Sequence, residues 1–264
     1  MKSIYALFKV FGLVLATLTI YSVYIIGYGC LKLVGKPTKS WLNRILRYWG
    51  KTCARFLSIS VKTLGEKPNP PFFLVSNHLS YVDIIVLFKE LDTTFVAKSE
   101  VADWPVLGFI AKSIGIVFIE RKNRMDISRV NREISDKVSS DRGLTLFPEG
   151  TTSPGAEILR LKPSLLEYPA KSKLGAHYCC LHYSIDSGKQ SSHEIVSWWG
   201  DAPMHTHLFR LAKEKSITAE ITFGQNTLHD SDRKRLAKKL HRKMSDQFKP
   251  MCQIGDTSYE PIQF

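Results

Sequence analysis

A long apolar stretch near the N-terminus restricts how this end of the chain can fold. Residues 10–31 form a run of 22 residues without a charged side chain. As a helix the run would be about 33 Å long, enough to cross the hydrocarbon core of a bilayer. A cleaved signal peptide is the rival interpretation, but the run is longer than a usual signal-peptide core, and Ile-Gly-Tyr-Gly-Cys-Leu-Lys is a poor cleavage site. We therefore expect a retained helix associated with a membrane.

The distribution of charge points to the same environment. The chain has 264 residues and a formal net charge of +13, and residues 1–65 contain ten Lys or Arg and no Asp or Glu. A nucleic-acid-binding protein more often spreads its positive charge over a folded surface. Charge beside an apolar run instead fits attraction to anionic lipid head groups. More Lys and Arg follow the run than precede it, so the positive-inside rule places the rest of the chain in the cytoplasm.

A second N-terminal segment, residues 40–58, has the pattern of an amphipathic helix. Its apolar and aromatic side chains recur every three to four residues, and basic side chains occupy another face. Such a helix suits the membrane interface. A helix packed on the globular domain is the alternative, and the two interpretations are compatible if they concern different faces.

After Glu66, strand-like and helix-like segments alternate, which predicts an α/β domain with a mixed, twisted sheet between helices. We expect a division into residues 1–62, a membrane anchor with an interfacial helix, and residues 63–264, the globular domain. The expected strands are residues 72–76, 93–97, 115–119, 143–147, 178–185, 194–198 and 217–223. The expected helices are residues 81–91, 105–113, 127–139 and 232–248.

The first motif with catalytic chemistry is Asn-His-Leu-Ser-Tyr-Val-Asp at residues 77–83, directly after an expected strand. On one helix, His78 and Asp83 would point about 140° apart, so they can meet only in a turn that leads into a helix. An Asp that accepts a hydrogen bond from one ring nitrogen fixes the tautomer, and the other nitrogen can then take a proton. Alone the motif is weak, since an Asp that caps a helix near an unrelated His has the same spacing.

Two further strands end in polar residues. Residues 115–121 end in Arg121, whose planar guanidinium suits phosphate, although a surface Arg in an ion pair gives the same pattern. Residues 143–151 end in Pro-Glu-Gly-Thr, where Gly150 permits close approach of the backbone and Glu149 can bind hydroxyls or a cation. An ordinary turn at the end of a strand is the alternative.

Together and in this order, the motifs resemble those of the glycerolipid acyltransferases, the family of lysophosphatidic acid acyltransferase-like enzymes. The resemblance covers roughly residues 65–200 and rests on Asn-His-x4-Asp, Gly-x-x-Phe-Ile-x-Arg and Phe-Pro-Glu-Gly-Thr. The first block implies that His78 is the catalytic base and that Asp83 orients it. The second implies that Arg121 recognises phosphate.

The third block implies that Glu149, Gly150 and Thr151 shape the acceptor site. The segment Phe-Val-Ala-Lys-Ser-Glu also matches the family and implies a second phosphate contact from Lys98. The chain departs from the family pattern at Thr152-Ser153, at Leu161-Lys162-Pro163-Ser164 and at residues 176–181. These departures fall on the acceptor side of the expected pocket, so they leave the reaction in place and put the acceptor in doubt.

The resemblance implies a membrane-bound O-acyltransferase that moves an acyl chain from acyl-CoA or acyl carrier protein to the hydroxyl of a lysophospholipid. We expect the acceptor to be 1-acyl-sn-glycerol 3-phosphate, which would give phosphatidic acid. A lyso-aminolipid or a lysophospholipid with a larger head group is the alternative acceptor, and a non-catalytic lipid-binding protein is the alternative function.

Membrane lipids are the remaining expected partners, and nucleic acid is not expected. The implied mechanism requires no metal or cofactor, because the acceptor hydroxyl is itself the nucleophile. Five scattered cysteines show no ligand-like spacing, which favours reduced thiols in a cytoplasmic domain on the inner membrane.

Overall fold

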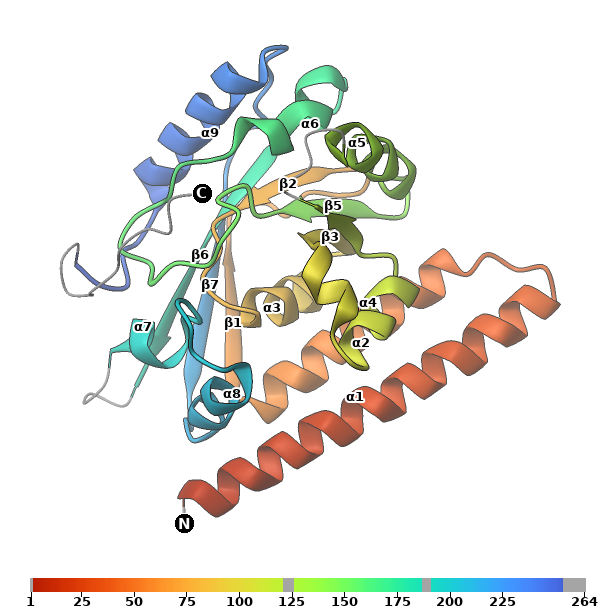
Figure 1. The fold of residues 1–264 in the computed structure, drawn as a ribbon, viewed down its shortest axis with the longest axis vertical. Coiled ribbons are helices and arrows are strands. Elements are labelled where there is room, and N and C mark those ends of the chain that lie inside the picture. The colour runs from red at the N-terminus through yellow and green to blue at the C-terminus, as the bar shows by residue number, and fades with distance from the viewer. Residues whose placement is uncertain (1, 121–125, 187–190, 254–264) are drawn as a thin grey trace.

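The computed structural model describes residues 2–120, 126–186 and 191–253. Its centre is a seven-stranded sheet with the strand order β1-β7-β6-β2-β5-β3-β4 (Figure 1). The strands are β1 (Ile59–Leu64), β2 (Phe73–Ser76), β3 (Thr93–Lys98), β4 (Val117–Ile119), β5 (Gly143–Leu146), β6 (His177–Ile185) and β7 (Ile217–Phe223).

The sheet is mixed, as the sequence predicts. Strands β6 and β7 pair antiparallel, whereas the other neighbouring strands pair parallel. Strands β2, β5, β3 and β4 therefore run in one direction, and their carboxyl ends share one edge of the sheet. Ligands in open α/β sheets bind at this kind of edge.

Helices cover both faces of the sheet (Figure 1). The long helices of the N-terminal segment are α1 (Lys2–Leu33) and α2 (Lys39–Phe56). The remaining helices are α3 (Val82–Glu90), η1 (Ser99–Asp103), α4 (Leu107–Ser113), α5 (Asp126–Lys137), η2 (Pro163–Leu166), α6 (Glu167–Lys171), α7 (Ser192–Ile195), α8 (Met204–Ala212) and α9 (Arg233–Gln247).

Helix α2 lies between α1 and the globular domain, which supports the second of the two interpretations of residues 40–58. The indole N–H of Trp41 donates to the carbonyl of Tyr24 at 3.2 Å. The indole N–H of Trp49 donates to Oγ1 of Thr17 at 3.1 Å. The aromatic side of α2 therefore faces α1, while its small residue Gly50 allows close contact with the backbone of α3.

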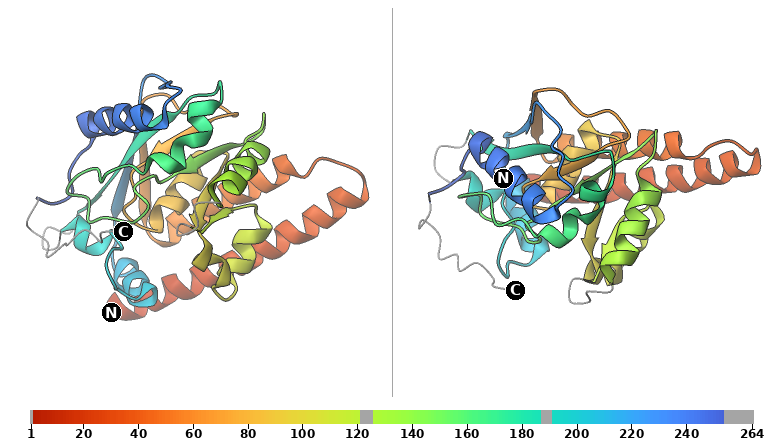
Figure 2. Two further views of the ribbon diagram at one scale, coloured as in Figure 1. Left: turned by 45° about the horizontal axis from the view of Figure 1, so that its top comes forward. Right: turned by 90° about the horizontal axis from the view of Figure 1, so that it is seen from above.

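Helix α1 runs beside α2 and along the domain, and its C-terminal end extends past the sheet together with the start of α2 (Figure 2). Near its start, Nζ of Lys9 donates to Oγ of Ser58 at 2.8 Å and to the carbonyl of Glu214 at 2.7 Å. Further along, the hydroxyl of Tyr21 donates to Oγ of Ser113 at 2.9 Å. Within the described ranges, α1 is the one helix that could cross a membrane by length and composition.

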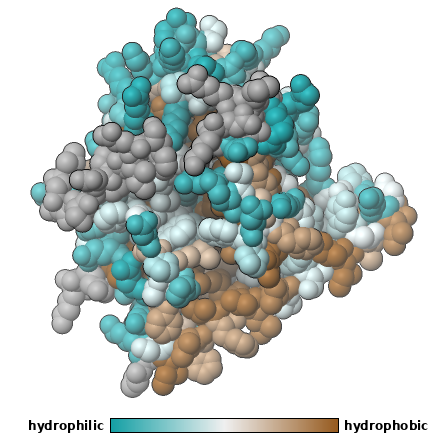
Figure 3. Space-filling view, viewed as in Figure 1, coloured by the Kyte–Doolittle hydropathy of each residue, from teal (hydrophilic) through white to brown (hydrophobic). Residues whose placement is uncertain are grey.

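The outward side of α1 is apolar and exposed. Figure 3 shows apolar side chains gathered along this helix. They include Phe8, Phe11, Leu15, Leu18 and Ile26, each more than two-fifths exposed. An apolar surface of this extent on a soluble monomer would be unusual and marks an interaction site.

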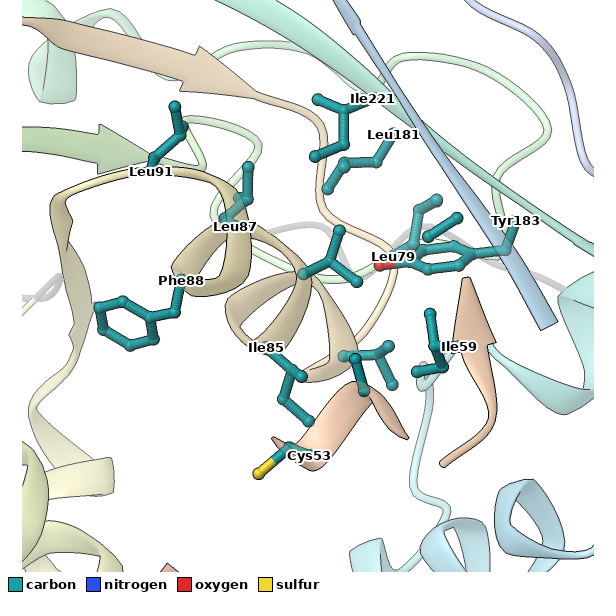
Figure 4. Packing of buried hydrophobic residues seen from close by; sticks show 14 of the residues in the cluster. Cys53, Ile59, Leu79, Ile85, Leu87, Phe88, Leu91, Leu181, Tyr183 and Ile221 are labelled. Carbon is teal, nitrogen blue, oxygen red and sulfur yellow. The ribbon is translucent and has the colours of Figure 1, made fainter. Parts of the chain in front are cut away.

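Two hydrophobic cores fill the two faces of the sheet, because consecutive residues of its central strands alternate between them. In β2 and the residue before it, Phe72 and Leu74 contribute to the core under α2 and α3, whereas Phe73 and Val75 contribute to the core under α5 and α9. Figure 4 shows the first core, in which side chains of α3 meet those of the central strands.

Two expectations about the sheet were incomplete or wrong. Strand β1 was not predicted, and the expected boundary between residues 62 and 63 lies inside it. Residues 194–198 do not form a strand: they begin in α7, and the backbone N–H of Trp198 bonds to the carbonyl of Leu79 outside the sheet. Ile195 and Val196 are buried in the first hydrophobic core without joining the sheet, so tertiary packing overrides their strand propensity.

Candidate active site

His78 lies after β2, in the turn that leads into α3. Asp83 occupies the first turn of α3, and its Oδ2 atom is 2.8 Å from Nδ1 of His78. A carboxylate can only accept a hydrogen bond, so Nδ1 carries the proton and Nε2 is the basic nitrogen. The imidazole is 21% exposed, and no hydrogen bond to Nε2 comes from the described part of the chain.

Asp83 is a fully buried carboxyl group that receives four hydrogen bonds. Besides His78, Oδ2 accepts the backbone N–H groups of Leu79 at 2.7 Å and Ser80 at 3.1 Å. The other oxygen, Oδ1, accepts from the hydroxyl of Tyr183 at 2.7 Å. These donors offset the cost of burying a carboxylate and hold it in one orientation toward the imidazole.

Tyr183 is a site residue that the sequence motifs do not reveal. It lies on β6, its side chain is completely buried, and 100 positions separate it from Asp83. Burial raises the pKa of the Tyr183 phenol well above its ordinary value, so the hydroxyl remains a protonated donor. Its hydroxyl points toward the start of α3 (Figure 4).

Asn77 ties the segment that carries His78 to β6. Its Nδ2 donates to the carbonyl of Leu181 at 3.1 Å, and its Oδ1 accepts the N–H of the same residue at 2.7 Å. On the other side, the carbonyl of His78 accepts from the N–H of Ser153 at 3.0 Å. The backbone around His78 is therefore fixed to two neighbouring segments.

A column of aromatic rings supports the imidazole from one side. The ring of His78 stacks on Phe147, with centroids 4.0 Å apart and planes 14° apart. Phe147 stacks in turn on Phe95, whose edge-to-face contact with Phe88 continues the column. Phe88 then meets Trp49 of α2 edge to face at 6.0 Å. The column reaches from the candidate base to the N-terminal helices.

Glu149 lies beneath this turn and contacts the backbone of the candidate base. Its carboxyl is buried, and Oε1 accepts the backbone N–H of His78 at 3.2 Å. Burial raises the pKa of this carboxyl well above its ordinary value; hydrogen bonds from His78 and Leu159 oppose the shift, and nearby Asp83 adds to it. Within the described residues, Oε2 has no hydrogen-bond partner. Through its hydrogen bond with the N–H of His78, Glu149 helps to hold the backbone of this residue in position.

Gly150 and Thr151 continue the same turn. Gly150 has φ +75°, and its N–H donates to the carbonyl of Phe147 at 3.1 Å. The turn favours glycine because of this backbone angle; a Cβ would come within 2.9 Å of Nζ of Lys162, but the flexible end of that side chain can move aside. Thr151 is partly buried next to it.

The structure places Lys98 at the carboxyl end of β3, paired in register with Ile119 of β4. It therefore lies on the same edge of the sheet as His78 and Glu149, two strands away from β2. Arg121, the expected phosphate-binding residue, lies outside the described residues.

Comparison with known proteins places the chain in a family. The family model described as Acyltransferase matches residues 58–178. The lyso-ornithine lipid O-acyltransferase of Brucella abortus is 30% identical over 88% of this chain and 91% of its own length. The chain belongs to the acyltransferase family. The 1-acyl-sn-glycerol-3-phosphate acyltransferase of Neisseria gonorrhoeae is 28% identical over 69% of this chain and 71% of its own length.

A solved structure shows the same fold. The crystal structure of the 1-acyl-sn-glycerophosphate acyltransferase from Thermotoga maritima matches with a TM-score of 0.59 at 18% identity. The match covers 93% of this chain and 97% of that one, so it includes the N-terminal helices as well as the sheet.

The candidate site thus joins a partly exposed imidazole, a buried carboxylate and a backbone fixed by hydrogen bonds. Such a pair can remove a proton from a hydroxyl placed at Nε2. No group of three or more His, Cys, Asp or Glu in the described ranges is arranged to hold a metal ion. The five cysteines are free thiols, and burial raises the pKa of Cys53 and Cys180 to about 12.

Proposed function

We propose that this acyltransferase esterifies the free hydroxyl of a lyso-lipid with an acyl chain carried as a thioester on coenzyme A or acyl carrier protein. The observation that carries the proposal is the contact between His78 Nδ1 and Asp83 Oδ2 at 2.8 Å, with Nε2 left as the basic nitrogen on a partly exposed ring. Asp83 is buried and fixed by three further donors, so it can stabilise the imidazolium that forms when Nε2 takes a proton.

The reaction then balances without a covalent enzyme intermediate. Nε2 of His78 removes the proton from the acceptor hydroxyl as the oxygen attacks the thioester carbonyl. The carbon–sulfur bond breaks, and the imidazolium returns the proton to the leaving thiolate. The enzyme's own contribution is the orientation of the imidazole, through Asp83 on one nitrogen and the Phe147 ring on one face.

Two acceptors fit this chemistry. The relative from Brucella abortus that matches nearly the whole chain is named for lyso-ornithine lipid, which favours a lyso-aminolipid. The relative from Neisseria gonorrhoeae, named for 1-acyl-sn-glycerol 3-phosphate, matches over a shorter range. The departures from the family pattern near Lys162 and in β6 fall on the acceptor side of the expected pocket and leave room for an acceptor other than 1-acyl-sn-glycerol 3-phosphate. We therefore propose lyso-ornithine lipid as the first acceptor to test and 1-acyl-sn-glycerol 3-phosphate as the second.

Phosphate recognition separates the two acceptors. For a phosphorylated acceptor, Lys98 at the carboxyl end of β3 would contribute one contact and Arg121 a second. A lyso-aminolipid does not require a phosphate contact. A substitution of Arg121 therefore weakens the use of 1-acyl-sn-glycerol 3-phosphate more than the use of lyso-ornithine lipid.

We also propose that α1 lies in the plane of a membrane and does not cross it. The contacts of Lys9 and Tyr21 hold two parts of α1 against the domain, so the helix cannot leave the domain to span a bilayer without breaking them. Its exposed apolar side would enter one leaflet, and the globular domain would face the cytoplasm.

The test is acyl transfer from labelled acyl-CoA and acyl carrier protein to both acceptors, with wild-type enzyme and His78→Ala in native membranes. Product that disappears in the variant supports the proposed reaction, and the acceptor that is used identifies the substrate. The variant Tyr178→Phe, whose side chain lies in the second core on the opposite face of the sheet from Tyr183, is the control and should retain activity. The proposal would be refuted if the wild-type protein is folded and membrane-bound but shows no acyl transfer that depends on His78.

A further inference from the structure

Beyond the N-terminal segment, positive charge is concentrated on one helix. Residues 66–229 contain nineteen Lys or Arg and nineteen Asp or Glu, so this part of the chain is neutral. Residues 230–249 contain eight Lys or Arg and three Asp. The excess of this second region lies on α9 and is separate from the charge that flanks the apolar run.

The geometry of α9 directs this charge outward. Its inward side, formed by Leu236, Ala237, Leu240 and Met244, is buried in the core under the sheet. Its six exposed side chains before residue 245 are all basic, and they are Lys234, Arg235, Lys238, Lys239, Arg242 and Lys243. At 100° per residue these positions cover about half of the helix circumference over a length of about 14 Å.

Some of this charge is compensated and some is not. Arg235 and Lys239 both pair with Asp230, at 2.9 Å each. Lys234, Lys238 and Arg242 lie four residues apart in a row, and none forms an ion pair with the described residues. Placing like charges at this spacing costs free energy on an isolated helix, so a row of this kind favours binding of an anionic partner.

The membrane that accepts α1 cannot be this partner. Figures 1 and 2 place α9 and α1 on opposite sides of the sheet, and Figure 3 shows polar side chains over α9 and apolar ones along α1. Because the apolar side of α9 is already buried in the core, the helix cannot insert into a lipid surface. With α1 on the bilayer, the basic face of α9 points toward the aqueous phase.

Helix α9 also contacts the loop that follows the catalytic motif. Nε2 of His241 bonds to the carbonyl of Ile158 at 3.1 Å. Just beyond the helix, the N–H of Met251 donates to the carbonyl of Gly155 at 2.7 Å. A macromolecule bound to α9 would therefore stand next to the segment that leads from Glu149 to Lys162.

We propose that the outer face of α9 is the docking surface for an acidic acyl carrier protein that delivers the acyl thioester. This proposal rests on the function proposed above and identifies the donor and the place where it binds. The carrier would lie against Lys234, Lys238 and Arg242, and its flexible prosthetic arm would extend past the 155–158 loop toward His78. The membrane side then supplies the acceptor and the aqueous side the donor.

The shape of the surface favours a folded acidic protein over coenzyme A. The basic residues lie along a convex, exposed helix, and most are Lys, whereas compact phosphate sites are concave and use the fork of Arg or backbone N–H groups. Extended, complementary charge instead accelerates the encounter of two proteins and makes it sensitive to salt.

The experiment compares KM for acyl carrier protein and acyl-CoA donors in the double variant Lys238→Glu/Arg242→Glu. We expect KM for the carrier-linked donor to rise roughly tenfold at low salt, because two attractions become repulsions. KM and kcat with acyl-CoA should stay within twofold of wild type. The matched control is Arg132→Glu/Lys215→Glu, which reverses one Arg and one Lys at exposed positions outside α9 and leaves both donors unaffected.

Each other outcome has a definite meaning. An unchanged KM for the carrier-linked donor, equal loss with both donors, or use of acyl-CoA alone would overturn the docking proposal while the proposed reaction stands. Loss of binding to vesicles that contain anionic lipid, with unchanged kinetics, would assign α9 to a membrane and also overturn it. No transfer from either donor by the wild-type enzyme would refute the proposed function itself.

Discussion

Removal of one buried hydroxyl tests whether the buried carboxylate orients the imidazole. Tyr183→Phe deletes the donor at 2.7 Å from Oδ1 of Asp83 and leaves the aromatic ring in place. Oδ1 accepts no other hydrogen bond from the described residues, so it becomes a buried, unsatisfied carboxylate oxygen. A hydrogen bond to a charged group contributes about 1.5–3 kcal/mol. The free energy of unfolding should therefore fall by about that amount.

The expected fall in kcat for Tyr183→Phe is smaller than the fall expected when the general base itself is removed. The three donors to Oδ2 remain, so Asp83 keeps its contact with His78 and loses one of its four hydrogen bonds. If about half of the lost stabilisation, roughly 0.75–1.5 kcal/mol, is expressed in the transition state, kcat falls roughly 4- to 13-fold, since each 1.36 kcal/mol changes a rate tenfold. Loss of the general base itself should cost about 10²–10⁴-fold.

The assay combines kcat for acyl transfer with urea unfolding followed by tryptophan fluorescence. Tyr178→Phe is the control, because Tyr178 lies on the same strand and its hydroxyl forms no hydrogen bond with the described residues. In an Asp83→Ala background, Tyr183→Phe should change the unfolding free energy little, because the acceptor is absent. The reasoning is wrong if Tyr183→Phe lowers kcat and the unfolding free energy no more than Tyr178→Phe does. It is also wrong if Tyr183→Phe still lowers the unfolding free energy when Asp83 is replaced by Ala.

Three further predictions concern the turns around the base. Burial raises the pKa of the Glu149 carboxyl in the folded state above its value of about 4.5 in the unfolded chain. The stability that this carboxyl contributes is therefore complete below pH 4.5 and is lost as the pH rises toward the pKa of the folded state. Glu149→Gln keeps an acceptor for the N–H of His78 but cannot ionise. In unfolding measurements from pH 4 to pH 9, the variant should become more stable relative to wild type as the pH rises. A difference in stability that does not change with pH would contradict this. Gly150→Ala should destabilise the fold by about 1–3 kcal/mol, because Ala must adopt φ +75°, and thermal unfolding would show it. Asn77→Ala should cost about 1–3 kcal/mol and lower kcat, because the backbone N–H of Leu181 loses its acceptor; unchanged urea unfolding would contradict this.

Sequence patterns predicted those elements whose local order of apolar and polar side chains matches their place in the folded protein. The run 217–223 alternates apolar and polar side chains and forms β7 with these bounds. The turn-then-helix geometry of residues 77–83 also followed from the spacing of His78 and Asp83, since no regular helix could bring them together. Strand β1 was missed because it follows directly on the amphipathic pattern of α2 and carries Lys62 on its exposed side.

The candidate site was only partly predictable because several of its contacts are long-range. Tyr183 and Asp83 are 100 residues apart, and nothing local to β6 distinguishes a Tyr that binds a carboxylate from one that fills a core. The resemblance marked Glu149 as a site residue, but only the fold shows that its oxygen meets the backbone of His78. These contacts depend on the parallel order β6-β2-β5, which brings three distant segments to one edge.

The aromatic column has a consequence for the preparation of a water-soluble fragment. It ends at Trp49, whose indole is bonded to Thr17 of α1, so the supports of His78 continue into the N-terminal helices. A fragment that starts at β1 would uncover the side of α3 that carries Phe88 and Ile85, which α2 covers in the intact chain. Deleting the apolar N-terminal helices to gain solubility would thus expose a new apolar surface on α3 and remove part of the packing that supports the His78 ring. Detergent or nanodisc preparations of the whole chain avoid both effects.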